Sequence, residues 1–163
     1  FNSEIPIAPW DGDGLPRQKT VWVENGVVKN LAYSRFWAEK KGVPPLSRPG
    51  GGFGGGGYMF SGGNQSLAEM ISTTERGVLV TRFWYIRAVD PQTLLFTGLT
   101  RDGTFYIEDG KIKFPLKNFR FNESPIIMLN NIEAMGKPQR VGGSMIPPMK
   151  IRDFTFSSLS DAV

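Results

Sequence analysis

The sequence predicts an α+β fold whose sheets are mostly antiparallel, built from hairpins and a meander, with about three short helices. Two observations lead to this prediction. First, β-prone runs are separated by Asn-Gly or Asp-Gly pairs, which favour tight turns, at Asn25, Asp102 and Asp109. Second, short helical stretches are bounded by serine at the start and glycine at the end. A doubly wound α/β fold would instead need strands that alternate with longer helices.

The first part of the chain predicts a loop, a hairpin and a helix. Residues 7–18 carry glycine or proline at every second or third position, which is typical of a loop. Residues 20–31 place two β-prone runs around an Asn-Gly pair, so a hairpin is expected there. Residues 33–42 predict a short helix with Ser34 as N-cap and Gly42 as its C-terminal stop.

The middle of the chain predicts a helix followed by a series of strands. Ser66 and Glu69 have the spacing of a capping box, which starts a helix, and Gly77 is expected to end it. Residues 78–89 form a long β-prone run. A meander of three strands is expected over residues 93–114, with a turn at each of its two Asp-Gly pairs.

The end of the chain predicts a third helix and a closing strand. Over residues 124–136, Ser124 is the expected N-cap, Pro125 the first helical residue and Gly136 the residue after the end. Residues 149–159 are expected to form one final strand. These elements add up to roughly seven or eight strands in one α+β arrangement.

Length and composition set the limits of the chemistry. At 163 residues the chain is expected to be a single domain, with a Pro/Gly-rich connector at residues 43–65 inside it. The sequence contains no cysteine and no histidine, which excludes Ser–His and Cys–His catalysis and argues against a zinc site. We therefore assign no catalytic residue, metal ligand or cofactor. The lack of cysteine is consistent with a cytoplasmic location, and no run of residues is apolar enough for a membrane span.

The charge of the chain is mildly basic. Its formal net charge is +4, and its pI is about 9.5. The 19 lysines and arginines are scattered along the sequence, which favours an ordinary solvated surface over a nucleic-acid site. Nucleic acid is therefore not the expected partner, and a basic nucleic-acid-binding module stays the alternative function.

A glycine-rich stretch at residues 48–64 matches the dinucleotide pattern G-x-G-x-x-G twice. That pattern binds a pyrophosphate only where a strand precedes it and a helix opens within it, and neither is predicted here. We expect a connector that is mobile or draped over the surface. If the stretch has a function, its side chains Phe53, Tyr58, Met59 and Phe60 are better candidates than the glycines, as a surface that contacts a partner.

The acidic segment at residues 11–14, DGDG, resembles the beginning of a calcium loop. In an EF-hand, the fifth position would carry a further ligand and the twelfth a glutamate. Leu15 and Trp22 occupy these positions instead. We therefore expect a turn and no calcium site.

The β-prone run at residues 78–89 contains an unusual mixture of arginine and aromatic residues. Alternation gives it two faces: Arg82, Trp84 and Ile86 on one, and Phe83, Tyr85 and Arg87 on the other. Such side chains can line a groove for a peptide or a nucleic acid. The favoured alternative is a central strand covered on both sides, whose arginines pair with Asp90 and Glu123.

Planar polar side chains are also dense in two segments near the expected strand ends, TGLTRDG and KNFRFNES. They could bind a carboxylate or backbone amides, or they could serve turn and capping chemistry. The candidate contacts for a peptide or partner are Arg82, Trp84, Arg87, Arg101, Asp102, Asn118, Arg120, Asn122 and Glu123.

Four stretches taken together resemble the TldD/PmbA family. They are DGDGLPRQKTVWVENGVVKNLAYSRFWAEKKG, SLAEMISTTERGVLVT, GTFYIEDGKIKFPLKNFRF and MKIRDFTFSSLSDAV. They occur in the family's order, and the resemblance runs from about Trp10 to Val163. It identifies the chain as a C-terminal domain of such a protein, and so as a piece of a longer one.

The resemblance implies a role in intracellular proteolysis. Members of the family are peptidase-type proteins that were once described as modulators of DNA gyrase, and they are associated with maturation of peptide antibiotics and degradation of an antitoxin. In the TldD branch, an upstream HExxxH helix and a late cysteine bind the catalytic metal, expected to be zinc. The PmbA (TldE) branch lacks this motif and pairs with TldD as a non-catalytic subunit.

This chain departs from the TldD pattern in the segment that would carry the late cysteine. Residues 140–148 read RVGGSMIPP, and no HExxxH occurs in the sequence. The resemblance therefore implies a PmbA-like domain that is inactive alone and acts as scaffold, peptide groove or partner subunit. Its expected partners are a peptide or unfolded-protein substrate and a second subunit, in a homodimer or a heterodimer with a TldD-like protein. A gyrase-modulating module remains part of the alternative function.

Overall fold

The computed structural model describes residues 3, 5, 7–47 and 57–159 of the chain. Within them lie three helices and eleven strands, whose paired neighbours all run antiparallel, so the predicted α+β class is confirmed. The chain divides into two compact units, residues 1–61 with 138–146 and residues 62–137 with 147–163. The expected single domain stays a prediction.

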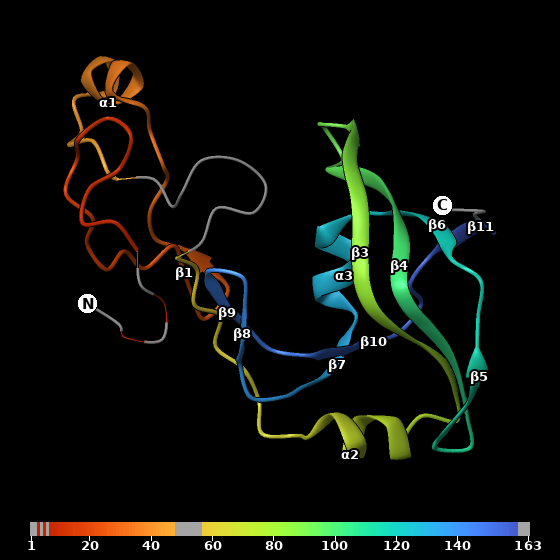
Figure 1. Cartoon of the computed structure of the whole chain (residues 1–163). Coiled ribbons are helices and arrows are strands. Elements are labelled where there is room, and N and C mark those ends of the chain that lie inside the picture. The colour runs from red at the N-terminus through yellow and green to blue at the C-terminus, as the bar shows by residue number, and fades with distance from the viewer. Residues whose placement is uncertain (1–2, 4, 6, 48–56, 160–163) are drawn as a thin grey trace. The chain divides into compact units, whose positions relative to one another are not determined.

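The first unit contains one helix and two short hairpins, drawn in red to orange and in blue in Figure 1. Its elements are β1 (Val23–Glu24), β2 (Val27–Val28), α1 (Arg35–Lys41), β8 (Gln139–Val141) and β9 (Ser144–Ile146). The hairpin of β8 and β9 was not predicted from the sequence.

The predicted hairpin at the Asn-Gly pair is confirmed. Val23 lies opposite Val28 and Glu24 opposite Val27, so Asn25 and Gly26 form a two-residue turn. Their φ angles are 51° and 77°, as a turn of type I′ requires. The local sequence was sufficient here because the turn needs no distant partner.

Helix α1 is also confirmed at both ends. The Ser34 hydroxyl accepts a hydrogen bond from the Trp37 backbone N–H at 3.4 Å, and Gly42 ends the helix with a φ of 66°. The acidic segment before it is a turn, as expected. One Asp11 carboxylate oxygen accepts the backbone N–H groups of Asp13 and Leu15 at 3.0 and 2.9 Å.

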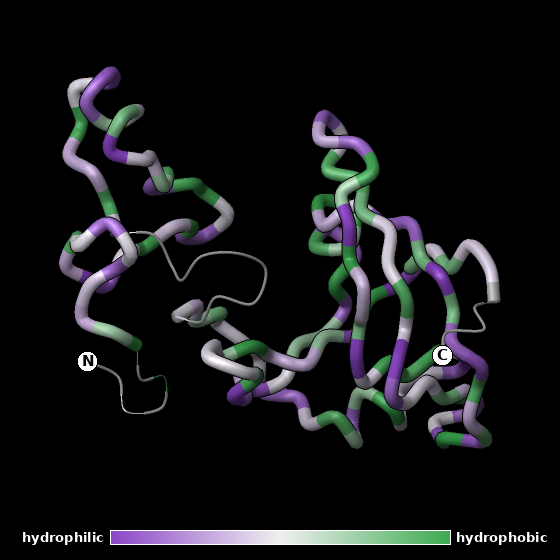
Figure 2. The backbone as a smooth tube through the Cα atoms, turned by 45° about the horizontal axis from the view of Figure 1, so that its top comes forward, coloured by the Kyte–Doolittle hydropathy of each residue, from purple (hydrophilic) through white to green (hydrophobic). Residues whose placement is uncertain are grey.

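The second unit is built around a five-stranded antiparallel sheet (Figure 1). Its helices and strands are α2 (Leu67–Ser72), β3 (Arg76–Asp90), β4 (Leu95–Glu108), β5 (Lys111–Pro115), β6 (Phe119–Glu123), α3 (Pro125–Asn130), β7 (Ile132–Met135), β10 (Met149–Ile151) and β11 (Phe156–Leu159). The sheet runs in the order β11-β6-β4-β3, with β5 also paired to β4. Figure 2 shows hydrophobic and hydrophilic stretches following one another along its long strands.

The expected turn at Asp102-Gly103 is wrong, because these residues lie inside β4. The φ angles of Asp102 and Gly103 are 60° and 137°, and together they oppose the single residue Thr81 of β3. Two residues facing one make a β-bulge, which uses the same positive φ as a turn. The Thr81 hydroxyl donates to both backbone carbonyl groups of the bulge, at 3.2 and 2.9 Å. The turn at Asp109-Gly110, by contrast, is confirmed between β4 and β5.

The capping box of α2 forms as predicted, but the helix ends earlier than expected. Ser66 and Glu69 exchange both hydrogen bonds of the box, which holds the pKa of Glu69 below its usual value. The Thr73 and Thr74 hydroxyls then donate to backbone carbonyl groups of the last turn. Such side-chain bonds compete with helix continuation. Gly77 therefore does not end the helix; it lies in β3 opposite Ile107.

The third helix and the closing strand are both shorter than predicted. Helix α3 begins at Pro125 as expected, but residues 132–135 leave it to pair as β7 with β10. Gly136 therefore lies beyond β7 and does not cap a helix. The expected strand over residues 149–159 is two strands: β10 pairs with β7, and β11 pairs with β6. Between them, Asp153 has a φ of 55°.

A cluster of five phenylalanines forms the apolar side of the sheet. Phe121 is 5% exposed, and its ring centroid lies 4.9 Å from that of Phe83 and 5.5 Å from that of Phe154. Phe156 packs on Phe154 at 5.1 Å and on Phe119 at 5.0 Å. Aromatic burial of this kind is the main stabilising term of a small sheet.

Candidate functional site

Four of the predicted contact residues meet on the surface of β3 and β4. The guanidinium carbon atoms of Arg82 and Arg101 lie 4.6 and 5.0 Å from the ring centroid of Trp84. Asp102 pairs with both arginines, through Arg82 Nη1 at 2.5 Å and Arg101 Nε at 3.4 Å. Trp84 is 40% exposed, so the cluster is open to solvent. It combines cation–π contacts with a carboxylate held between two guanidinium groups.

The strand register explains why these side chains meet. Arg82 lies directly opposite Arg101, and Trp84 lies opposite Leu99 on the same face. Asp102 follows Arg101 in the sequence and is part of the bulge, where its carboxylate reaches both arginines. A turn at this point would have separated Arg101 from Arg82.

A second bulge brings Arg87 to the same face as Trp84. Tyr85, with a φ of 55°, and Ile86 together oppose the single residue Gly98. The extra residue reverses the alternation, so that Arg87 lies opposite Thr97, on the face of Leu99. The predicted faces are therefore wrong for Arg87, which does not share a face with Phe83. Its guanidinium carbon lies 4.3 Å from the Tyr85 ring centroid.

Strand β6 adds two more of the predicted residues to this face. Arg120 lies opposite Leu99, and Asn122 lies opposite Thr97. The Arg120 guanidinium also donates to the Thr97 hydroxyl at 3.5 Å. We define the Arg–Trp face as the set of residues that this register places together: Arg82, Trp84, Arg87, Leu99, Arg101, Arg120, Asn122 and Thr97. Leu99 and Thr97 were not among the predicted contacts; they are identified by their register opposite predicted residues.

Two of the predicted residues instead hold the sheet together. Glu123 is 6% exposed, and its carboxylate accepts the backbone N–H groups of Ser124 at 2.9 Å and Thr155 at 3.0 Å. The Asn118 side chain accepts hydrogen bonds from the buried hydroxyls of Thr100 and Thr104, both at 3.4 Å. Both side chains satisfy buried polar groups of the sheet, and their contact with a ligand stays a prediction.

The expectation of a covered central strand is wrong for β3. In the described residues β3 pairs with β4 alone, so it is an edge strand. Tyr85 is 56% exposed, and the arginines pair with Asp102 instead of Asp90 and Glu123. The Asp90 carboxylate accepts the Thr93 hydroxyl and the Gln92 backbone N–H, which lowers the pKa of Asp90.

The described part of the glycine-rich stretch is paired and not free. Residues 48–56, including Phe53, lie outside the described residues. In the first unit, Met59 forms a parallel bridge with Met145, and Tyr58 and Phe60 exchange backbone hydrogen bonds with Met145 at 2.9 and 3.0 Å. Their side chains are exposed, and contact with a partner stays a prediction.

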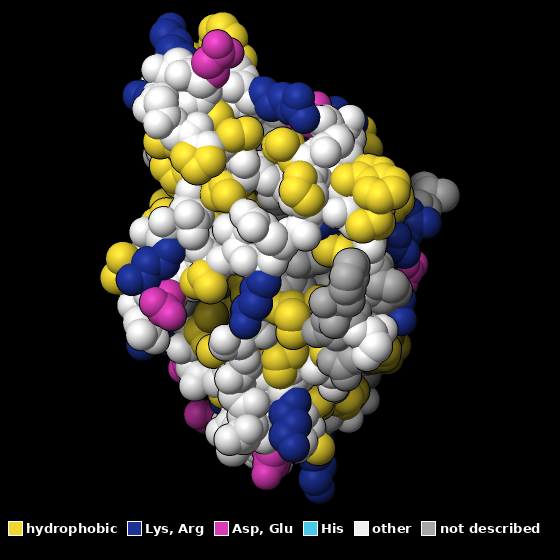
Figure 3. Space-filling model, turned by 90° about the vertical axis from the view of Figure 1, so that its left-hand side faces the viewer, with side chains coloured by type: hydrophobic (Ala, Val, Ile, Leu, Met, Phe, Trp, Pro, Cys, Tyr) yellow, Lys and Arg dark blue, Asp and Glu magenta, His cyan; other side chains and the backbone are white. Residues whose placement is uncertain are grey.

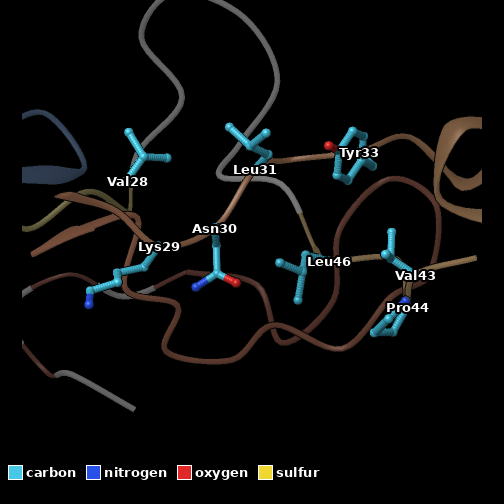
Figure 4. A pocket seen from close by; sticks show the side chains of 8 residues that line it. All are labelled: Val28, Lys29, Asn30, Leu31, Tyr33, Val43, Pro44 and Leu46. Carbon is cyan, nitrogen blue, oxygen red and sulfur yellow. The ribbon is translucent and has the colours of Figure 1, made fainter. Parts of the chain in front are cut away.

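A pocket of about 470 Å³ lies within the first unit. Figure 4 shows that its lining comes from two segments; the residues are Val28, Lys29, Asn30, Leu31, Tyr33, Val43, Pro44 and Leu46. Most of them are apolar, and the Asn30 side-chain amide donates a hydrogen bond to the Val21 backbone carbonyl at 2.7 Å. Lys29 pairs with Glu24 at 3.5 Å. The pocket therefore presents few polar groups with which to select a ligand.

The surface drawn in Figure 3 has no concentrated basic patch. Hydrophobic side chains spread across this face, with lysine and arginine side chains scattered among them.

None of the helices in the described part of the chain is long and apolar enough to span a membrane.

These features define an α+β module whose antiparallel sheet exposes arginine and aromatic side chains. The chain belongs to the PmbA/TldD family: the family model described as the PmbA/TldA metallopeptidase C-terminal domain matches residues 2–158. A protein of Methanothermobacter thermautotrophicus named "Metalloprotease" is 28% identical in an alignment 144 residues long, which covers 82% of this chain and 30% of that protein.

Solved structures with the same fold include TldE from Thermococcus kodakarensis, with a TM-score of 0.74 and 23% identity over 93% of this chain and 36% of that one. A candidate modulator of DNA gyrase from Bacteroides thetaiotaomicron gives a TM-score of 0.74 and 24% identity over 93% of this chain and 33% of that one. Another candidate modulator of DNA gyrase, from Thermotoga maritima, gives a TM-score of 0.72 and 20% identity over 92% of this chain and 35% of that one. The chain thus spans about a third of the length of these relatives.

The family's description as a metallopeptidase implies a metal, which needs suitable donor side chains. The sequence has no histidine or cysteine, and the described residues hold no group of three or more acidic side chains that could bind a metal ion. These donors do not fit a catalytic zinc site, which takes its ligands mainly from histidine, cysteine and carboxylates. No catalytic step through a metal can be assigned to residues of this chain.

Proposed function

We propose that this chain is the peptide-holding, non-catalytic region of a PmbA-like protein that takes part in cytoplasmic proteolysis or peptide maturation. The metal would come from a TldD-like subunit with which the protein forms a dimer. The observation that carries the proposal is the long edge strand β3, which bears the Arg–Trp face and pairs on one side only among the described residues. An edge strand can bind an extended peptide through its backbone and needs no catalytic side chain.

The exposure of β3 and its regular backbone support an extended peptide as the ligand. Over residues 81–89, every residue of β3 is exposed, which leaves backbone and side chains accessible to a neighbouring strand. The bulge at Tyr85-Ile86 interrupts this edge of β3, a device by which proteins prevent uncontrolled sheet association. A substrate segment can pair with the regular part of the strand, from Arg76 to Trp84.

Cleavage assays test the non-catalytic assignment. The protein that contains this chain is purified alone and together with a TldD-like subunit, and each sample is incubated with unfolded peptides with and without a chelator. We expect cleavage in the mixture only, and its loss on adding the chelator, because the metal belongs to the other subunit. Chelator-sensitive cleavage by the protein alone would contradict the proposal.

A further inference from the structure

The Arg–Trp face has an excess of positive charge. It holds four arginines, and among the described residues Asp102 is the acidic side chain that pairs with any of them. Arg87 and Arg120 form no ion pair within the described residues; their hydrogen bonds go to Tyr85 and Thr97. A surface of this kind is complementary to a ligand that carries several negative charges.

Asp102 shows how this surface holds a carboxylate. Its two oxygens contact Arg82 and Arg101, whose guanidinium groups lie on the ring of Trp84. Stacking on the ring limits the motion of both arginines, so their donors are already oriented. A carboxylate from a ligand can take the position that Asp102 occupies in the free protein.

The spacing of the arginines favours acidic side chains along an extended peptide over a single terminal carboxylate. Arg82 and Arg87 follow one another along β3, whereas Arg101 lies on β4 and Arg120 on β6. A peptide paired to the free edge of β3 would place every second side chain on this face, beside Arg82 and Trp84. Nucleic acid fits less well, because two guanidinium groups already lie on the Trp84 ring and leave less of it for a base to stack on.

We propose that the Arg–Trp face selects extended peptides with acidic residues at alternate positions, and that Asp102 competes with them for Arg82 and Arg101. This inference rests on the proposed function, since it assumes that the peptide pairs with β3. It adds the chemical class of the ligand, which backbone pairing alone does not determine.

Three synthetic peptides test the inference on the protein that contains this chain. They alternate threonine with glutamate, glutamine or lysine, and all are amidated so that no terminal carboxylate contributes. At low salt we expect the glutamate peptide to bind about tenfold more tightly than the glutamine peptide, with a smaller ratio at high salt. Equal binding of these two would overturn the selectivity and leave strand pairing intact. No binding of any peptide would overturn both proposals.

Substitutions of single residues distinguish the contribution of Asp102 to peptide binding from that of the arginines. In Asp102→Asn, the new asparagine also tolerates the positive φ of this position. We expect this substitution to increase the affinity for the glutamate peptide about threefold and to leave the affinity for the glutamine peptide unchanged. Arg82→Gln and Arg101→Gln should each reduce the ratio between the two peptides. The matched control is Arg152→Gln, because Arg152 is also exposed and pairs with a neighbouring aspartate, at 3.6 Å, outside the face. A similar loss with the control, or tighter binding of single-stranded DNA than of the glutamate peptide, would contradict the inference.

Discussion

Replacing Phe121 by alanine is expected to cost about 3–5 kcal/mol of the free energy of unfolding, because a buried aromatic side chain is removed. Phe121 packs against Phe83 and Phe154, and its ring lies over Gly98. A Cβ atom added at Gly98 would be 2.5 Å from the Phe121 ring, so little space separates the ring from the sheet. Its loss would leave a cavity that the β4 backbone cannot fill. Denaturant unfolding followed by circular dichroism measures the difference.

Phe114→Ala is the matched control for this substitution. Phe114 is 51% exposed and stacks on Tyr106, with their ring centroids 5.1 Å apart. Removing it should cost less than about 1.5 kcal/mol, since it loses one aromatic contact and little burial. Equal costs for the two substitutions would show that the phenylalanine cluster is not the core of the sheet.

Gly63→Ala is expected to destabilise the protein by about 1–3 kcal/mol, through a clash that the backbone must relieve. A Cβ atom at residue 63 would lie 2.2 Å from the carbonyl oxygen of Met135. That carbonyl belongs to β7, which is fixed by pairing with β10, while the Gly63 N–H donates to the Gly136 carbonyl at 3.0 Å. The melting temperature should fall accordingly.

The control for this prediction is Gly12→Ala. A Cβ atom at residue 12 meets nothing within 4 Å, so this substitution should leave the melting temperature unchanged or slightly higher. If Gly63→Ala behaved like Gly12→Ala, the end of the predicted connector would be a free linker and not part of the second unit.

Elements with local signals were predicted well from the sequence. The type I′ turns at Asn25-Gly26 and Asp109-Gly110, the capping box at Ser66 and the start of α3 at Pro125 each depend on a few neighbouring residues. Such signals act within the segment that contains them, and tertiary contacts here do not override them.

Elements that depend on distant strands were not predictable in the same way. The pair Asp102-Gly103 has the sequence of a turn, but β4 pairs through it with β3, so it becomes a bulge. Residues 132–135 continue a helical pattern, yet they pair with residues 149–151. In both places a partner far along the chain decides the outcome, and the local pattern does not contain that partner.

The candidate site shows the same division. The density of arginine and aromatic residues identified Arg82, Trp84, Arg101 and Asp102, which do lie together. Strict alternation assigned Arg87 to the wrong face, because the bulge at Tyr85-Ile86 could not be seen in the sequence. Glu123 was selected for its type, but its burial and two backbone hydrogen bonds make it structural.

Hydrogen exchange at β3 tests most directly the claim that an extended peptide pairs with this strand. The protein that contains this chain is compared with and without the alternating glutamate–threonine peptide, and backbone N–H exchange is followed by segment. We expect slower exchange from Arg76 to Trp84, because N–H groups that face away from β4 gain acceptors, and no change in β6, which is already paired on both sides. Protection elsewhere in the protein, with β3 unchanged, would contradict the account.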